Sequence, residues 1–405
     1  ILCVDQDLDG TGKIAPLVLV WIWLFWPALI INGCVGRFMT PLIRAYPKKG
    51  PKVPIEFFYE VAYREWVEAN AGCLKDHDIL YFKGLGAHEE HDVARMFTHE
   101  SFRRNIYTYT VDETTKRLFE VYYGADPALR KNALVTPVGQ LSREEAETMR
   151  TSRKIPIGQV QLNIDSKLYK NDAIKRQIPG GVDGLNPARR KVGAALGKRF
   201  AKSKRPIKVF QLGGFVADVL MYHHGDTSLN GTIITMTQSF IGARKYPYLI
   251  GAGQFGDRHG EDAATFRYVS VSPSPLFDAT FPPDDRWFLR YVFEDGERAE
   301  PWTYVPVAPM TALESYAIVS EGWNHDSFSR DFGAVMKVVD AYIAGEPTLH
   351  ALADRLVAAA PRDPSDSRGE NKQEPIDAIL ADIQKVASKW PLPACIRGQP
   401  DSMVR

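Results

Sequence analysis

The first third of the chain alternates between short apolar runs and longer segments with helical spacing. The opening residues ILCV predict a strand that runs into an acidic turn within residues 1–12, and residues 13–31 predict a helix packed against a sheet. Strand-then-helix patterns recur in GRFMTPLIRAYP, IEFFYEVAYREWVEAN and HDILYFKGLGAHEEHDVARMF. This alternation predicts an α/β domain with a parallel sheet over residues 1–110, followed by a charged helical connector over residues 111–160.

The pattern changes over residues 161–305. A basic stretch, KNDAIKRQIPGGVDGLNPARRKVGAALGKRFAKSKRPIK, precedes two segments with helical character, QLGGFVADVLMYHHGDTSL and NGTIITMTQSFIGA. A polar, glycine-rich loop, GAGQFGDRHGEDAATFRY, then leads into the strand RYVSVS. Helix–turn–helix material with basic flanks and a following β-hairpin is typical of a winged-helix DNA-binding module. Residues 306–405 form a third region, in which helical runs surround a polar, proline-bearing loop.

One segment makes a membrane span an alternative. The chain has no charged residue between Lys13 and Arg37, and IAPLVLVWIWLFWPALII is long enough to cross a bilayer. However, Pro16 and Pro27 bracket the segment, and it follows an acidic turn that needs water or a metal ion. Helices that are apolar on every side also occur in the cores of large proteins. We therefore expect a buried helix in a soluble protein.

Composition narrows the picture only slightly. The 405 residues suggest two or three domains, and 45% hydrophobic residues provide ample material for their cores. The net charge of +1 does not point to a polyanionic partner, so local basic patches would have to bind one. The four scattered cysteines include no CxxC pair, which disfavours zinc and fits a reducing compartment. Because the chain opens inside an apolar strand, we expect it to be a fragment.

The motif DQDLDG places three carboxylates, Asp5, Asp7 and Asp9, directly after the first apolar run. Alternate residues leaving a strand point the same way, so these side chains could share a hard cation such as Mg²⁺. An EF-hand is excluded, because its twelfth position requires glutamate and Pro16 stands there. The alternative is an Asp-rich turn that caps the next helix.

Four further motifs carry possible chemistry, and each has a structural alternative. Lys83 in YFKGLG could approach a phosphate, but such a glycine turn is often structural. The run around Arg176, Arg190 and Lys191 could track a phosphate backbone or be a solvated face. In YHHGD, adjacent helical residues point about 100° apart, so two histidines would not share a metal ion. Tyr268, preceded by Arg267 at the end of the glycine-rich loop, could be a nucleophile or one of many packing tyrosines.

Taken in order, DQDLDG, YFKGLG, VDGLNPARRK, YHHGD, GQFGDRHGEDAATFRY and EPWTYVPVAPM resemble the central portion of type IIA DNA topoisomerases. They fit the eukaryotic and large-DNA-virus branch better than the bacterial one. The resemblance runs from residue 1 to about residue 323. It implies a partial TOPRIM domain over residues 1–110, a winged-helix domain with the catalytic tyrosine over residues 161–305, and the beginning of a tower domain over residues 306–405.

The resemblance also assigns roles to individual residues. Asp5, Asp7 and Asp9 match the family's metal-binding motif, and Lys83 matches a lysine near the cleaved phosphate. Arg267 and Tyr268 match the arginine and nucleophilic tyrosine of the family. It implies DNA contacts for Arg176, Arg190, Lys191, His223 and His224, and for Val319 or Ile318 at the place of a DNA-intercalating isoleucine.

The implied activity is ATP-dependent cleavage and religation of double-stranded DNA through a transient 5′-phosphotyrosine link, with Mg²⁺ as cofactor. ATP would bind an ATPase domain that this sequence does not contain, and a homodimer would complete each active site in trans. The protein would act in the nucleus of a eukaryotic host, or in the cytoplasm for a cytoplasmic DNA virus.

The chain departs from the family pattern in several places. The family's catalytic glutamate, in an EGDSA-like motif, has no counterpart here, and Thr11–Gly12 replace the usual Ser–His. The intercalating loop is reduced to SYAIVSEGW, and most of the tower and the exit gate are missing. A non-catalytic DNA-binding or assembly fragment is therefore an alternative. A nuclease or primase that shares only the TOPRIM motif is another, although it leaves YHHGD and Arg267–Tyr268 unexplained.

Overall fold

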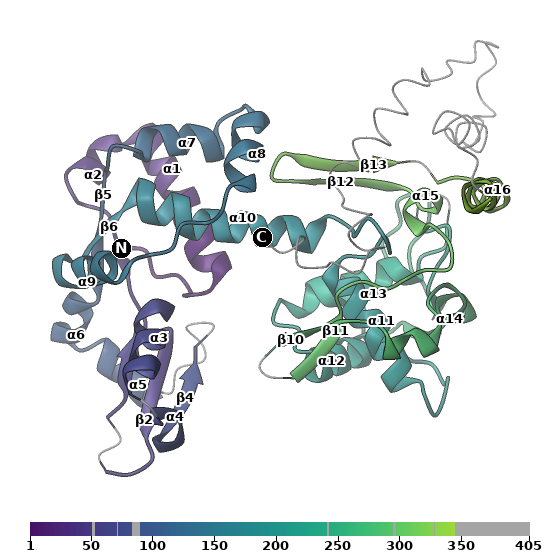
Figure 1. Ribbon diagram of the computed structural model, residues 1–405, viewed down its shortest axis with the longest axis horizontal. Helices are drawn as coiled ribbons and strands as arrows, with labels where there is room; N and C mark the ends of the chain where they lie inside the picture. The colour runs from purple at the N-terminus through teal and green to yellow at the C-terminus, as the bar shows by residue number, and fades with distance from the viewer. Residues whose placement is uncertain are drawn as a thin grey trace. The chain divides into compact units, whose positions relative to one another are not determined.

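The structure, a computed structural model, describes residues 1–50, 53–70, 72–82, 90–240, 243–294, 297–327 and 329–344. Its elements form two compact units (Figure 1). The first comprises Ile1–Ile174 together with Glu321–Trp323, and the second comprises Lys175–Ser320 and the described residues from Asn324 onward.

The elements up to the end of the first unit alternate irregularly between helices and short strands. In chain order they are η1 (Gly10–Ile14), α1 (Ala15–Phe25), α2 (Pro27–Ile31), β1 (Gly36–Phe38), β2 (Ile43–Pro47), β3 (Ile55–Phe57), α3 (Glu60–Ala69), α4 (Cys73–Asp76), β4 (His77–Tyr81), α5 (Glu90–Met96), α6 (His99–Arg104), β5 (Ile106–Thr110), α7 (Thr115–Tyr123), α8 (Pro127–Val135), α9 (Arg143–Ser152), β6 (Lys154–Pro156), η3 (Ile157–Ser166) and α10 (Lys167–Gln177).

The remaining elements belong to the second unit, apart from the turn between its last two strands. They are α11 (Pro187–Arg199), β7 (Ile207–Lys208), α12 (Val209–Val219), α13 (Asp226–Thr237), β8 (Leu249–Ala252), β9 (Ser270–Pro273), α14 (Pro275–Thr280), η4 (Pro283–Trp287), β10 (Tyr291–Glu294), β11 (Glu297–Pro301), α15 (Met310–Leu313), β12 (Tyr316–Ser320), β13 (Trp323–Ser327) and α16 (Phe332–Ile343).

The expected parallel sheet is instead two small sheets, so that prediction was wrong in its topology. In one, β1 pairs antiparallel with β5, and only β5 and β6 run parallel. The other, in the order β3-β2-β4, is antiparallel throughout. The opening run ILCV contributes a single parallel bridge between Leu2 and Arg37 rather than a strand. Apolar runs of three to five residues do not reveal their pairing direction, which explains the error.

The helices expected as a separate connector share the core of the first unit. Leu118, Phe119 and Tyr122 of α7 and Leu134 of α8 are buried with Tyr109 of β5 in one hydrophobic cluster. Residues 111–160 therefore pack as part of the first unit, and the division in the chain falls between Ile174 and Lys175.

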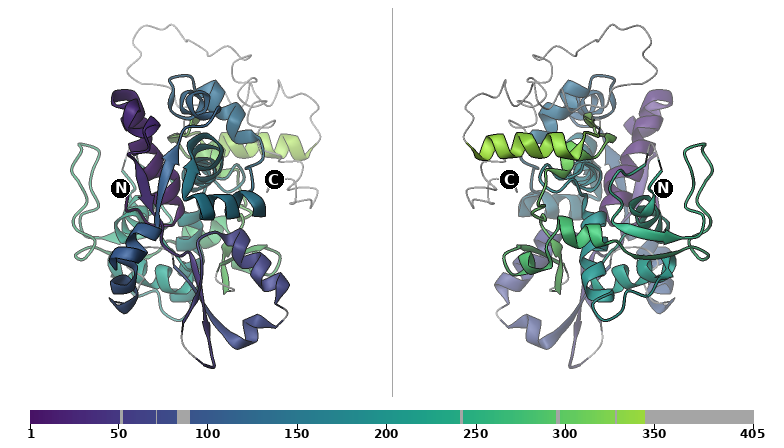
Figure 2. Two further views of the ribbon diagram at one scale, coloured as in Figure 1. Left: turned by 90° about the vertical axis from the view of Figure 1, so that its left-hand side faces the viewer. Right: turned by 90° about the vertical axis from the view of Figure 1, so that its right-hand side faces the viewer.

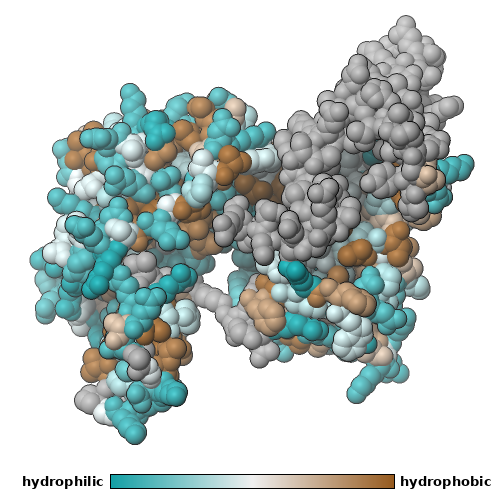
Figure 3. Space-filling model, in the orientation of Figure 1, coloured by the Kyte–Doolittle hydropathy of each residue, from teal (hydrophilic) through white to brown (hydrophobic). Residues whose placement is uncertain are grey.

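The segment 13–31 is helical, but the prediction that it is buried was wrong. The helix breaks at Trp26, where Pro27 begins α2, and only Ala15, Pro16 and Leu19 of α1 are buried. Large apolar side chains face outward along the rest of α1 and α2: Leu17, Trp21, Leu24, Phe25, Trp26, Leu29 and Ile31. Figure 2 shows these purple helices at the margin of the first unit, and in Figure 3 brown apolar patches reach the surface among hydrophilic residues. No described helix is long and apolar enough to cross a membrane.

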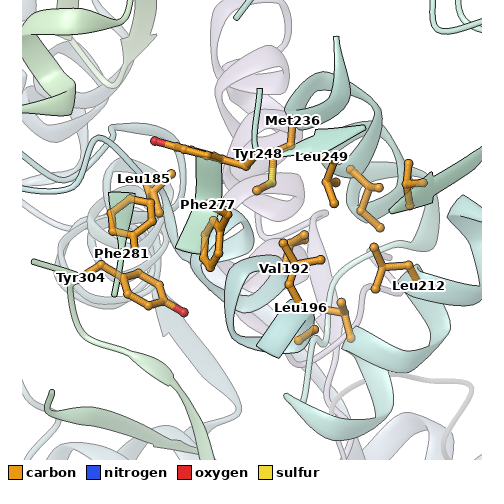
Figure 4. Close-up of a cluster of buried hydrophobic side chains, with 14 of the residues drawn as sticks. Leu185, Val192, Leu196, Leu212, Met236, Tyr248, Leu249, Phe277, Phe281 and Tyr304 are labelled. Carbon is orange, nitrogen blue, oxygen red and sulfur yellow. The ribbon is translucent and has the colours of Figure 1, made fainter. Parts of the chain in front are cut away.

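The second unit combines helices with a three-stranded antiparallel sheet in the order β7-β9-β8. Side chains of α11, α12 and α13, the sheet and α14 form its core, including Val192, Leu212, Met236, Leu249 and Phe277 (Figure 4). α11 begins where the Asn186 side chain accepts a hydrogen bond from Arg189 N–H, with Pro187 at the first helical position. Helices followed by an antiparallel sheet are the parts that a winged-helix module requires.

Candidate functional site

The acidic motif lies at the beginning of the first helix of the chain. Asp7 caps that helix, because its carboxylate accepts a hydrogen bond from Gly10 N–H over 2.7 Å. Leu8 and Asp9 already have helical conformation, so the argument from strand alternation does not hold for these aspartates. The capping alternative thus describes Asp7.

The three carboxylates nevertheless influence one another. Burial raises the pKa of Asp7, and the charges of Asp9 and Asp5 raise it further. No group of three His, Cys, Asp or Glu side chains within the described parts of the chain is arranged to hold a metal ion. The donor chemistry therefore suits a hard cation, while shared coordination by Asp5, Asp7 and Asp9 stays a prediction.

Tyr268 occupies a turn that leads directly into the central strand β9. Its side chain is 74% exposed, and its N–H donates to the Thr265 carbonyl over 2.8 Å. The Tyr268 carbonyl accepts a hydrogen bond from the ammonium of Lys208 over 2.7 Å. Arg267, in the same turn, is also exposed. The turn therefore presents a phenol and a guanidinium to solvent from a backbone that the sheet holds in place.

The two histidines of YHHGD lie in the loop between α12 and α13, not on a helix as the sequence suggested. The His224 Nδ1 atom is 3.3 Å from Nη1 of Arg176, at the end of α10. Tyr222 packs edge-on against the His224 ring, with 5.4 Å between ring centroids. The fold thus brings together Arg176 and His224, which lie 48 residues apart in the sequence.

Arg190 and Lys191 were predicted to contact DNA, and the structure contradicts this for both. Arg190 donates two hydrogen bonds to the buried carboxylate of Asp183, over 2.7 and 3.0 Å. Lys191 is buried, with its ammonium 2.7 Å from a Glu300 carboxylate oxygen and 2.6 Å from the Leu220 carbonyl. Because acidic partners already bind these cations inside the fold, their role is to hold the second unit together.

The shortened intercalating loop forms a β-hairpin. β12 and β13 join through Glu321 and Gly322, whose φ angles of 51° and 94° fit a tight two-residue turn. Val319 projects from β12 with 71% of its side chain exposed, so it is accessible for the wedge role that the sequence suggested. Lys83 lies outside the described residues.

Sequence reasoning missed Lys208, the residue that holds the Tyr268 carbonyl. In the sequence it is one of several lysines in KSKRPIK, and nothing in that run distinguishes it. Only the antiparallel pairing of Lys208 with Ser270 brings it beside the tyrosine.

Comparison with known proteins connects these features. Residues 176–361, which contain His224 and Tyr268, match the family model for the A-type polypeptide of DNA gyrase/topoisomerase IV. Residues 38–155 match the model of the C-terminal associated domain of TOPRIM. The chain is 45% identical over 373 residues to a DNA topoisomerase 2 of African swine fever virus, an alignment that covers 90% of this chain.

The chain belongs to the type IIA DNA topoisomerase family.

Eukaryotic members of the family are also similar. The chain is 32% identical over 368 residues to DNA topoisomerase 2 of Caenorhabditis elegans, covering 86% of this chain and 23% of that protein. Its fold matches the crystal structure of the DNA-binding, cleavage and re-ligation domain of Plasmodium falciparum topoisomerase II. That match has a TM-score of 0.66 and 26% identity, and covers 85% of this chain and 46% of the other. The chain spans 31% of the length of the viral topoisomerase.

Proposed function

We propose that this chain forms the DNA-cleavage core of a type II topoisomerase, with Tyr268 as the nucleophile. The observation that carries the proposal is the exposed Tyr268 turn, which lies within the segment that matches the gyrase and topoisomerase IV family model. The fold match to a domain named for DNA binding, cleavage and re-ligation supports the same assignment.

In the proposed reaction, the phenol oxygen of Tyr268 forms a bond to a backbone phosphorus of duplex DNA. The bond between that phosphorus and the 3′ oxygen breaks, which leaves the 5′ end covalently attached to the tyrosine. The phenol proton passes to water or to the DNA, and the departing 3′ oxygen takes up a proton. Arg267 would stabilise the charge that develops on the phosphate, and the reverse sequence reseals the strand.

Arg176 and His224 would bind the DNA backbone near the break. Their side chains lie 3.3 Å apart, and a phosphate oxygen could accept hydrogen bonds from both. Asp5, Asp7 and Asp9 would hold Mg²⁺, which supplies positive charge for the phosphate and the leaving oxygen when bound. A cation there would also relieve the repulsion that raises the Asp7 pKa. We propose that two copies of the chain act together, and that passage of a second duplex and use of ATP require the longer assembly.

The decisive experiment uses a chimaera in which this chain replaces the matching segment of the African swine fever virus enzyme. Labelled duplex DNA is trapped with denaturant during cleavage, and the adduct is mapped by peptide mass. Tyr268→Phe should abolish the adduct and change DNA affinity less than about threefold, since it removes one neutral hydroxyl from a surface bound through phosphates.

Tyr222→Phe serves as the control, because this tyrosine is also near His224 but its hydroxyl is within hydrogen-bonding distance of Ser228. It should retain the adduct. An adduct that survives Tyr268→Phe, or maps to Tyr222, would overturn the assignment. DNA binding without any adduct, in a chimaera that folds, would instead support the non-catalytic alternative.

A further inference from the structure

Hydrogen bonds connect the turn that carries Tyr268 to the segment formed by residues 208–210. Two of them use only backbone atoms: Val209 N–H donates to the Val269 carbonyl over 3.1 Å, and Phe210 N–H donates to the Phe266 carbonyl over 3.3 Å. Another comes from a side chain, because the Lys208 ammonium donates to the carbonyl of Tyr268 over 2.7 Å. The backbone bonds therefore hold the residues on either side of Tyr268, and Lys208 holds Tyr268 itself.

The position of Lys208 is fixed by the fold. Its backbone pairs with Ser270 in the sheet, and its N–H donates to the Gln211 side chain over 3.1 Å. The next residue, Val209, is fully buried at the start of α12. The ammonium thus reaches the turn from a rigid base, and a lysine retains two further N–H donors after this bond.

We propose that Lys208 is a positioning residue for Tyr268, which holds the tyrosine backbone in register while the phenol approaches and leaves the phosphate. This rests on the proposed function of Tyr268 as nucleophile. A nucleophile on an exposed turn needs such a restraint, because a misplacement of about 1 Å can slow a reaction about 100-fold. Sixty residues of sequence separate the two partners, so the contact exists only in the folded chain.

The first test measures the restraint itself, by hydrogen exchange on this chain. Lys208→Met removes the donor but preserves the length of the side chain, and it leaves both backbone bonds intact. Exchange at the Tyr268 N–H should then accelerate about tenfold, whereas the Val209 and Phe210 N–H groups should keep their protection. Unchanged exchange at Tyr268 would overturn the proposal. Loss of protection at all three groups would also overturn it, because Lys208 would then support the whole segment.

The second test measures catalysis in the chimaera. Lys208→Met should slow both adduct formation and religation from bound DNA by about 10- to 100-fold. DNA affinity should change less than about threefold, and Lys208→Arg should restore most of the rate. The matched control is Lys245→Met, because Lys245 also donates to a backbone carbonyl over 2.7 Å, that of Arg330, and should leave both rates unchanged.

Two outcomes of the second test would contradict a positioning role. If Lys208 only contacts a phosphate, Lys208→Met should weaken binding and lower the salt slope by about one, with a normal rate from the bound complex. Equal adduct rates in Lys208→Met and the parent would also refute it. If the parent chimaera forms no Tyr268 adduct, the proposed function fails, while hydrogen exchange still decides whether Lys208 holds the turn.

Discussion

Neighbouring basic residues of α11 have different environments although they are alike in sequence. Arg190 and Lys191 bind buried carboxylates, whereas Arg189 lies near a second cation. Burial lowers the pKa of Arg189 to about 10, and the charge of Arg244 lowers it further. A cluster of positive charge in the sequence is thus not evidence of a surface that binds DNA. The partner of each side chain decides whether its charge is available.

Asp112 shows how one carboxylate can join two helices. It lies just before α7 and accepts hydrogen bonds from Gly158 N–H over 2.7 Å and Gln159 N–H over 3.1 Å, at the beginning of η3. Partial burial acts to raise its pKa, but these bonds and those from Thr114 outweigh it, so the pKa is lowered from 3.8. A lowered pKa means that the charged form stabilises the fold.

We expect Asp112→Asn to destabilise the first unit by about 1–2 kcal/mol at pH 7, the usual cost of losing a helix cap. Because the folded pKa lies below 3.8, this contribution is complete above that value and is lost as the pH falls through the folded pKa. Urea unfolding of both proteins from pH 7 to pH 2 checks this. A difference in stability that stays constant down to pH 2 would show that charge is not the cause.

At the scale of elements, α1 and α2 differ from an ordinary core helix pair. Leu19 and Ile30 are buried, while Trp21, Phe25 and Trp26 form an exposed aromatic group whose ring centroids lie 4.9–6.4 Å apart. Apolar surface of this kind promotes self-association when it is left in water.

We expect Leu24→Glu to reduce self-association and the binding of a hydrophobic dye without lowering the unfolding temperature, since Leu24 is 70% exposed. Leu19→Glu is the contrasting control, because Leu19 is fully buried and a charge there should unfold the unit. Light scattering and thermal unfolding measure the two effects. If Leu24→Glu destabilises the fold as severely as Leu19→Glu, then the outer face is packed in the protein.

The hairpin β12–β13 is a second element with an unusual environment. Glu321, in its turn, forms an ion pair with Lys170 over 2.7 Å, and the Lys170 ammonium lies 4.7 Å from the centroid of the Tyr123 ring. Burial lowers the pKa of Lys170, and Glu321 opposes that shift. The left-handed conformation of Glu321, with φ at 51°, is thus accompanied by a partly buried salt bridge that favours it.

At the scale of the whole molecule, DNA binding and DNA cleavage should depend on different groups. Binding would come from basic side chains such as Arg176 and Arg267, and cleavage would also require the cation held by the aspartates. We expect EDTA to abolish the covalent adduct in the chimaera while DNA binding persists, and added Mg²⁺ to restore the adduct. Adduct formation at an undiminished rate in EDTA would contradict a role for the acidic motif.

The sequence by itself determined the family of this protein and the identity of its candidate nucleophile. The order of DQDLDG, YHHGD and Arg267–Tyr268 along the chain was enough, because chemistry that depends on particular residue types leaves local motifs. The glycine-rich loop before Tyr268 and the strand after it could also be predicted, since turn residues and alternating apolar residues act over short distances.

The tertiary structure decided which charges face solvent and which helix faces stay exposed. It placed Lys191 against Glu300, left one side of α1 uncovered and brought Lys208 to the Tyr268 carbonyl. None of these could be predicted, because each depends on segments that are distant in sequence and meet only when the chain folds. A lysine in an ion pair inside the fold and a lysine that could bind phosphate have the same letter, and burial and a partner's distance alone separate them.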